Sequence, residues 1–469
     1  MHSPYSFEEI QVNLAQQPER WVRQPGNDRS LRDLLKLKSQ LELLNLARVE
    51  QLFQTVAPQL CTLDSFRALQ SVCELQTESI ITVLSHPVST CWLYRAAELL
   101  HAADLEALPQ HLDGFAPLAI ACFAAARVDC VISDIMLPAK FSFPGFALMI
   151  NLDRPTRVRL EVKNSSEVGL LRLTCESLEF ETPIRCDTPE TDLTQQHRII
   201  GFPRFFEKRL TFEYGEPLLC DLFRADHTCY SDVDLKLWSR GLRRSESLLE
   251  RRWPEMYNEL STNLRVLTPT STAVTKHHST GSNRTAAGAI CTTLTYEPWF
   301  TDGLIHEHRH DLLNKLMLID GIFEDETSNS LIYYSPWRPD PRPAIGLFHA
   351  LYVFIAVAAF YERLLTAKEK DIDITTEDLL EAFGLQVLRL LIAVDELRGS
   401  TNFTRFGNDL LMVLDKETVR LHTVALETGA FRSGLAAELA RDHFQKWTKG
   451  NGIDVTTEVP QNVSKWAGI

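Results

Sequence analysis

Apolar residues recur with helical spacing over the first third of the chain. From Leu34 to Val56 leucines stand three and four positions apart, which places them on one face of a helix. Ala-rich segments follow at 96–108 and 116–127, and prolines separate them. The pattern predicts helices from about residue 30 to residue 135.

Near residue 140 the pattern changes to short segments in which apolar and polar residues alternate. The clearest are FALMINLD, TRVRLEVKN, GLLRLTCESLEFET and KRLTFEYG, each bounded by Gly, Pro, Asn or Asp. A period of two predicts strands with one buried face, as in an antiparallel sheet. We therefore expect an antiparallel β unit at about 140–226.

Helical periodicity returns at about residue 232, and most later segments also read as helices, at 301–320, 343–367, 376–398, 404–427 and 431–447. A polar stretch at 268–288 interrupts them and is too long for a tight turn. Inside a compact chain such a loop is often functional. Its polar residues either line a cleft or belong to a mobile surface loop, and for any single residue we favour the loop. The residues concerned include His277, His278, Ser279 and Asn283.

These patterns predict an α+β fold that is predominantly α-helical, with the antiparallel β unit in the middle. At roughly 150 residues per domain, a chain of 469 residues suggests about three units. We expect an N-terminal helical region at 1–139, a β-rich unit at 140–226 and a helical catalytic region at 227–469.

Composition narrows the class of protein. The chain has 48 basic and 62 acidic residues and a net charge of −14, which argues against a nucleic-acid partner. Ten cysteines without CxxC spacing indicate reduced thiols, and the N-terminus lacks the apolar core of a signal peptide. The apolar run Ala344–Phe360 is short for a membrane span. We expect a cytoplasmic protein without a membrane partner; the oligomeric state stays open.

The sharpest chemical signal is HEHRH, residues 306–310, within a leucine-flanked helical segment. The pattern HExxH places His306 and His310 one turn apart on one helical face, where both imidazoles reach one metal ion. Glu307 can then act on a metal-bound water or orient a ligand. His308 points to another face and is either a supporting residue or solvent-exposed. The C-terminal region is thus predicted to be a helical metal-binding core.

A third metal ligand should lie downstream, since two protein ligands rarely suffice. The longer HExxHxxGxxH motif is absent because Leu316 stands where its last histidine would be. A glutamate on a later helix is the other common choice, and Glu324 and Glu362 are the nearest. We favour His349, because it follows the motif and lies within the most apolar segment of the chain.

Between these helices lies YYSPWRPDPRP, residues 333–343. Prolines stiffen the segment, and a fixed guanidinium is suited to bind a carboxylate through two hydrogen bonds. Arg338 and Arg342 are therefore candidates for binding an acidic ligand, with Trp337 as a shield from water. The alternative is a loop whose arginines are solvated or pair with Asp340 and Asp325.

Three motifs in this order, LIHEHRHDLLNKL, YYSPWRPDPRP and GLFHALYVFIAVAAF, resemble the HExxH-motif peptide-modification proteins of bacterial ribosomal-peptide biosynthetic clusters. The resemblance covers about residues 280–360. The family looks like non-haem iron(II), 2-oxoglutarate-dependent hydroxylases that act on side-chain β-carbons of a precursor peptide. It implies that His306, His310 and His349 bind Fe(II), and that Arg338 or Arg342 binds the 2-oxoglutarate carboxylate.

Two other functions remain open. Three histidines depart from the usual two histidines and one carboxylate of such oxygenases, and the sequence shows no HxD motif or strand pattern of a double-stranded β-helix. HExxH alone indicates a zinc metallopeptidase in which Glu307 is the general base. A non-enzymatic metal-bound scaffold is the third reading, although a structural site normally has four ligands.

Overall fold

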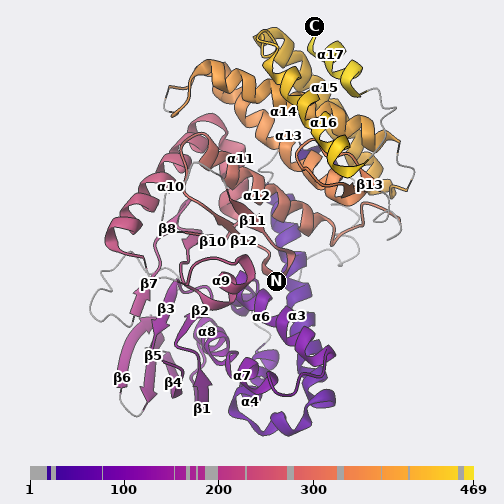
Figure 1. Cartoon of the computed structure of the whole chain (residues 1–469). Helices are drawn as coiled ribbons and strands as arrows, with labels where there is room; N and C mark the ends of the chain where they lie inside the picture. The colour runs from indigo at the N-terminus through magenta and orange to yellow at the C-terminus, as the bar shows by residue number, and fades with distance from the viewer. Residues whose placement is uncertain are drawn as a thin grey trace.

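The computed structural model describes thirteen stretches of the chain, namely residues 18–22, 28–75, 78–152, 154–164, 169–175, 178–184, 199–227, 230–271, 279–324, 332–370, 372–399, 402–452 and 459–468. The last helices gather at one end of the molecule, and the N-terminal helices lie with an antiparallel sheet at the other (Figure 1). The long helix α3 (Asp28–Val56) contacts other N-terminal helices and also α11 (Pro254–Asn263) and α12 (Trp299–Leu316).

The N-terminal part is helical, as the leucine and alanine patterns predict. Its helices are α2 (Pro18–Val22), α3 (Asp28–Val56), α4 (Asp64–Glu74), α5 (Glu78–Leu84), α6 (Pro87–His101), α7 (Leu108–Asp113) and α8 (Ala116–Ala126), with the 3₁₀ turn η1 (Pro58–Thr62). Helix α8 is buried from Ala116 to Phe123. It packs against α4, α5 and the strands that follow, so the first core forms between these helices and the sheet.

Two antiparallel sheets follow. The first has the order β1-β4-β5-β6, from β1 (Cys130–Leu137), β4 (Thr156–Asn164), β5 (Gly169–Cys175) and β6 (Leu178–Ile184). The second has the order β2-β3-β7, from β2 (Lys140–Phe143), β3 (Leu148–Asn151) and β7 (Ile199–Gly201). In β4 the residues Val158, Leu160 and Val162 are buried while their neighbours are not, as the period of two predicts.

The prediction of helix up to residue 135 is wrong at its end. Helix α8 stops at Ala126 because Arg127 adopts a left-handed conformation with φ of 57°. Strand β1 then begins at Cys130, before the expected start of the β unit at 140. Ile132, Ile135 and Leu137 face the core, and a bulge between the two isoleucines breaks the simple alternation. That bulge hid the strand pattern from a period-two reading.

A third sheet is mixed rather than antiparallel. Its order is β11-β12-β10-β9-β8, from β8 (Arg204–Phe205), β9 (Leu210–Phe212), β10 (Val266–Pro269), β11 (Thr280–Ser282) and β12 (Ala289–Thr292). Strand β10 is parallel to both β9 and β12. The sheet therefore crosses the expected boundary at 226, since it joins a strand of the 140–226 unit to strands of the C-terminal region.

The C-terminal region is helical, with α9 (Pro217–Phe223), α10 (Asp232–Arg252), α11 (Pro254–Asn263), α12 (Trp299–Leu316), α13 (Ala344–Thr366), α14 (Thr376–Arg398), α15 (Arg405–Thr428), α16 (Leu435–Asn451) and α17 (Val459–Ala467). A 3₁₀ turn, η2 (Arg284–Ala286), and the short hairpin β13 (Ile332–Tyr333) with β14 (Arg342–Pro343) connect them. The predicted helix at 431–447 starts later, at Leu435, because Gly434 has a positive φ of 74°.

The predicted fold class is confirmed: the chain is a predominantly α-helical α+β protein. Within the described ranges no sheet closes on itself, and the HExxH motif lies on a helix, so the fold is not a double-stranded β-helix. One large core joins α10 to α16 with the third sheet and the start of α3. Helices α12 and α13 pack against each other at its centre.

Among the described helices, α13 alone has the length and apolar composition of a membrane span. Most of its apolar window, 72%, is buried inside the protein. Such burial is what a central helix of a folded core shows, and α14, α12 and α15 cover its surface.

Candidate functional site

His306 and His310 lie on one face of α12, as the HExxH spacing predicts. Their ring centroids are 4.9 Å apart, with the rings edge to face at 68°. The helix is unbroken from Trp299 to Leu316, and its apolar residues Leu304, Ile305, Leu312 and Leu313 are fully buried. Burial of those four fixes the helix in the core and so fixes which face of it carries the two histidines.

His349 of α13 joins the pair from the neighbouring helix. Its Nδ1 lies 3.2 Å from Nδ1 of His310, and the two rings stack at 24° with centroids 5.5 Å apart. The structure thus brings together the three predicted metal ligands. We call His306, His310 and His349 the histidine cluster.

The geometry of the histidine cluster fits a metal ion in part. Two nitrogens bound to one ion at about 2.1 Å are roughly 3.0–3.4 Å apart, so the 3.2 Å between His310 and His349 suits two ligand positions. As the side chains stand, no three His, Cys, Asp or Glu groups within the described ranges are placed to hold an ion. A third position requires the His306 ring to turn, and its side chain is 20% exposed.

The histidine cluster is kept in the form that binds metals. Burial lowers the pKa of His349 to about 4. Burial, together with the charges of His306 and His349, holds the pKa of His310 well below its ordinary value. Near neutral pH both rings are therefore uncharged, and a neutral imidazole has the lone pair that a metal ion needs.

Glu307 is buried between α12 and strand β11, with 5% of its side chain exposed. Its Oε1 accepts a hydrogen bond of 2.5 Å from Thr280 and lies 3.8 Å from Nε2 of His306. Burial raises the pKa of Glu307, while hydrogen bonds from Thr280 and Ser282 lower it. The carboxyl is thus held beside the histidine cluster and can carry a proton there.

Thr280 and Ser282 were not among the residues singled out in the polar stretch. They stand two apart on β11, so they share one face of the strand and both reach Glu307. The spacing was visible in the sequence, but a three-residue strand is too short to recognise. Ser279 instead bonds Thr293, and Asn283 caps η2 through Thr285. His277 and His278 lie outside the described residues.

The other face of α12 carries a buried polar network. His308 is fully buried, so the alternative that it is solvent-exposed is wrong. Its Nε2 donates to Glu259 at 2.7 Å, and its Nδ1 accepts from Asn263 at 3.1 Å. Arg309 also donates to Glu259, at 2.9 Å, and Asp311 accepts from Asn263. These partners explain how a charged helix lies in an apolar core.

The proline-rich loop reaches the histidine cluster through aromatic contacts. Trp337 stacks on Phe354 of α13 with centroids 4.7 Å apart and the rings nearly parallel at 4°. Phe354 in turn packs edge to face on His306 at 4.8 Å. The indole Nε1 donates to Gln386 of α14 at 2.9 Å. Trp337 is therefore linked to His306 through Phe354.

The two predicted arginines face Asp340. Arg342 Nε lies 2.9 Å and Arg338 Nε 3.8 Å from carboxylate oxygens of Asp340. The Arg338 side chain is 59% exposed and that of Arg342 32%. This is the arrangement of the alternative reading, in which the loop arginines pair with an aspartate. Binding of a 2-oxoglutarate carboxylate by either arginine stays a prediction.

Neither carboxylate considered as the third metal ligand contacts the histidine cluster. Glu362 accepts two hydrogen bonds of 2.6 Å from Arg420 of α15. It lies thirteen residues after His349 on α13, roughly 20 Å along the helix axis. Glu324 is exposed. Among the three candidates, only His349 contacts the HExxH histidines.

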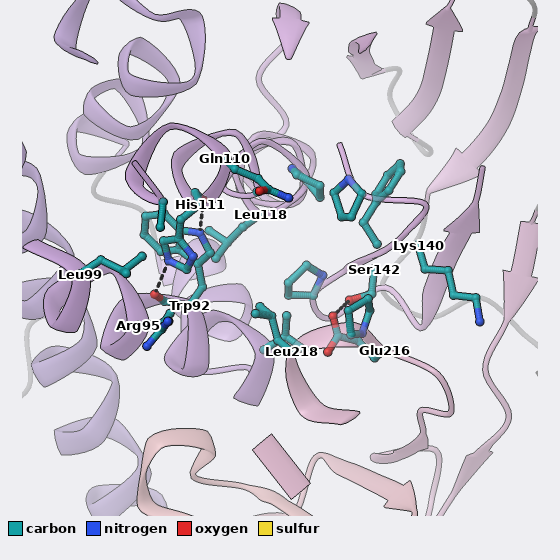
Figure 2. A pocket seen from close by; sticks show the side chains of 18 residues that line it. Trp92, Arg95, Leu99, Gln110, His111, Leu118, Lys140, Ser142, Glu216 and Leu218 are labelled. Carbon is teal, nitrogen blue, oxygen red and sulfur yellow. Dashed lines mark hydrogen bonds between the residues drawn. The ribbon is translucent and has the colours of Figure 1, made fainter. Parts of the chain in front are cut away.

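A separate cavity of about 270 Å³ lies far along the chain from these residues, between α6, α7, β2 and the start of α9 (Figure 2). Trp92 and His111 form one wall, where His111 Nε2 donates to the Trp92 carbonyl at 3.1 Å. Glu216 forms the opposite wall, and burial raises its pKa to about 8. None of the six predicted site residues lines this cavity.

Comparisons with known proteins add no family: no protein-family model and no curated protein sequence matches the chain. The three-motif resemblance therefore remains an expectation from the sequence.

Proposed function

We propose that the chain is a non-haem iron(II)- and 2-oxoglutarate-dependent oxygenase that hydroxylates a side chain, at the β-carbon, of a ribosomally synthesised precursor peptide. The observation that carries the proposal is the contact between His310 and His349. It places the histidine of the third motif against the HExxH motif, and the resemblance implies that these histidines bind one metal ion together. Glu362, the ligand a peptidase of the glutamate type would use, is bound to Arg420 instead.

In this proposal His306, His310 and His349 would hold the iron. The bound iron(II) supplies the site for 2-oxoglutarate and O₂ and the oxidising power for hydroxylation. Glu307, hydrogen-bonded to Thr280, orients His306, against which Phe354 also packs. Arg338 or Arg342 leaves Asp340 to bind the distal carboxylate of 2-oxoglutarate, and Trp337 shields that ion pair from water.

Succinate release tests the proposal. The protein is incubated with Fe(II), ascorbate, 2-oxoglutarate and a candidate precursor peptide. We expect peptide-dependent succinate and a peptide mass increase of one oxygen atom. His349→Ala should abolish both, whereas His101→Ala, an exposed histidine at the end of α6, should leave both unchanged. If wild type forms no succinate with any precursor peptide, the proposal fails.

A zinc metallopeptidase is the second candidate. It is favoured by the buried Glu307 only 3.8 Å from His306, because burial raises the pKa of this carboxyl and makes it a stronger base. Peptide cleavage by the zinc-loaded protein, lost in Glu307→Gln and kept in Glu362→Gln, would establish it. Absence of cleavage by wild type under these conditions removes this candidate.

A further inference from the structure

A cavity of about 290 Å³ lies on the other side of α12 from the histidine cluster. Its walls come from α3, the end of α5 with the turn after it, the segments that lead into β10 and β12, and the last turn of α12. Lys315 lies seven residues after His308 and therefore shares its face. His308 stands two residues from both His306 and His310, about 200° around the helix.

No acidic side chain of the described ranges lines this cavity. Four cationic side chains do, namely Lys36, Lys38, Arg265 and Lys315. Two of the four are almost fully buried: Lys38 is 4% exposed and Lys315 1%. A buried cation without a compensating anion is costly. In a chain of net charge −14, such a concentration of buried positive charge calls for an explanation.

Lys315 is fully compensated within the protein. Its Nζ donates to Asp311 at 2.6 Å and to the Asn263 side chain at 2.7 Å. Asp311 also accepts a hydrogen bond of 2.7 Å from the backbone amide of Gly288. Its carboxylate thus binds both Lys315 and Gly288. Both oxygens of Asp311 therefore make their hydrogen bonds to groups other than Lys38 and Arg265.

Neither Lys38 nor Arg265 forms an ion pair with a carboxylate of the described residues, although Glu42 and Asp311 act on the Lys38 charge from a greater distance. Within the described part of the chain Lys38 Nζ donates one hydrogen bond, to the Ser85 carbonyl at 3.2 Å, which leaves two N–H groups. The Arg265 guanidinium has no hydrogen-bond acceptor there. Burial lowers the pKa of Lys38 to about 8; Glu42 and Asp311 act to raise it, while Lys315 and Arg265 lower it further. Burial, aided by Arg209, also lowers the pKa of Arg265.

We propose that this cavity binds the oxyanion group, phosphate or carboxylate, of a small molecule through Lys38 and Arg265. A guanidinium and an ammonium facing one space are the usual ligands of such groups, and the guanidinium offers two parallel N–H donors. Lys315 adds positive charge without a direct bond. A volume of about 290 Å³ limits the ligand to a small molecule. The site is independent of the proposed oxygenase activity.

The test is a binding titration of the full-length chain with inorganic phosphate, and in a second arm with succinate, against sodium chloride at equal ionic strength. We expect saturable binding of at least one oxyanion and none of chloride. Lys38→Met and Arg265→Gln should each raise the dissociation constant at least tenfold. The arm that binds more tightly identifies the oxyanion as phosphate or carboxylate.

Three further variants separate the proposal from its alternatives. Lys236→Met removes an exposed lysine of α10 and should bind as wild type. The double variant Arg338→Gln, Arg342→Gln should also bind phosphate as wild type, which distinguishes this site from the proposed 2-oxoglutarate site. Arg265→Lys keeps the positive charge and should bind with intermediate affinity. It serves as a second test at this position in case Arg265→Gln does not fold. Unchanged affinity in Lys38→Met, or no binding of either oxyanion by wild type, overturns the proposal.

Discussion

The Nδ1 atoms of His310 and His349 lie 3.2 Å apart, although the two residues are 39 positions apart in the chain. Between two neutral rings this distance requires one nitrogen to donate and the other to accept. It is also the separation of two ligands on one metal ion. Helices α12 and α13 thus bring together two motifs that the sequence only places in order.

The first prediction concerns the metal. His310→Ala or His349→Ala should each remove most of the iron from protein reconstituted without oxygen, because each deletes a nitrogen of the closest pair. His306→Ala should do the same if its ring turns toward that pair. Glu362→Ala, which breaks only the pair with Arg420, should keep the metal. Metal analysis of the four variants checks this, and full occupancy in His349→Ala would refute the ligand assignment.

The second prediction concerns the cosubstrate. Lys substitution of the arginine that binds 2-oxoglutarate should raise the apparent 2-oxoglutarate constant at least tenfold and leave the metal content intact, because lysine keeps the charge but loses the paired donors. Arg338 is the first choice because it follows Trp337 and is held less closely by Asp340 than Arg342 is. Spectroscopic titration of the iron protein with 2-oxoglutarate measures it. Wild-type binding in both single variants would make the loop structural.

The third prediction concerns the network behind the histidine cluster. Glu259 is buried, and although burial favours its neutral form, Arg309 and the hydrogen bond from His308 hold its pKa below the ordinary value. Glu259→Gln leaves the Arg309 charge buried beside a neutral partner. We expect a loss of about 3–5 kcal/mol in the free energy of unfolding, measured with urea. Glu255→Gln, at an exposed position in the first turn of the same helix, should change stability by less than about 0.5 kcal/mol.

The fourth prediction is a pH dependence of stability. Burial raises the pKa of Glu216 to about 8, so between its ordinary pKa of 4.5 and pH 8 the folded protein binds a proton that the unfolded chain has lost. Stability from this group is therefore present at low pH and is lost as pH rises through that window. Glu216→Gln should keep the hydrogen bond from the Leu219 amide and remove this loss.

Chemical unfolding at pH 5 and pH 8 measures that effect. The variant should gain stability relative to wild type between the two values, on the order of a few kcal/mol. Glu98→Gln, an exposed glutamate, is the matched control and should show no such gain. An equal difference between Glu216→Gln and wild type at both pH values would contradict the assignment.

Much of the fold was predictable, because the spacing of apolar residues along a helix or strand shows which of its faces is buried. The helices α12 to α15 and the strand β4 follow directly from spacings of three to four and of two. Strand β1 was missed because its bulge removes the alternation. The parallel pairing of β10 with β9 and β12 joins distant segments and leaves no local trace in the sequence.

For the site, the sequence by itself determined that His306 and His310 share a face of one helix, since helical geometry alone requires it. It also indicated His349, as a polar residue in an apolar helix. Only the tertiary structure decided that Thr280 holds Glu307, that Phe354 stands between Trp337 and His306, and that Lys38 and Arg265 face one cavity. Each of these contacts joins elements far apart in the chain, and their meeting depends on how the whole core packs, which no local pattern encodes.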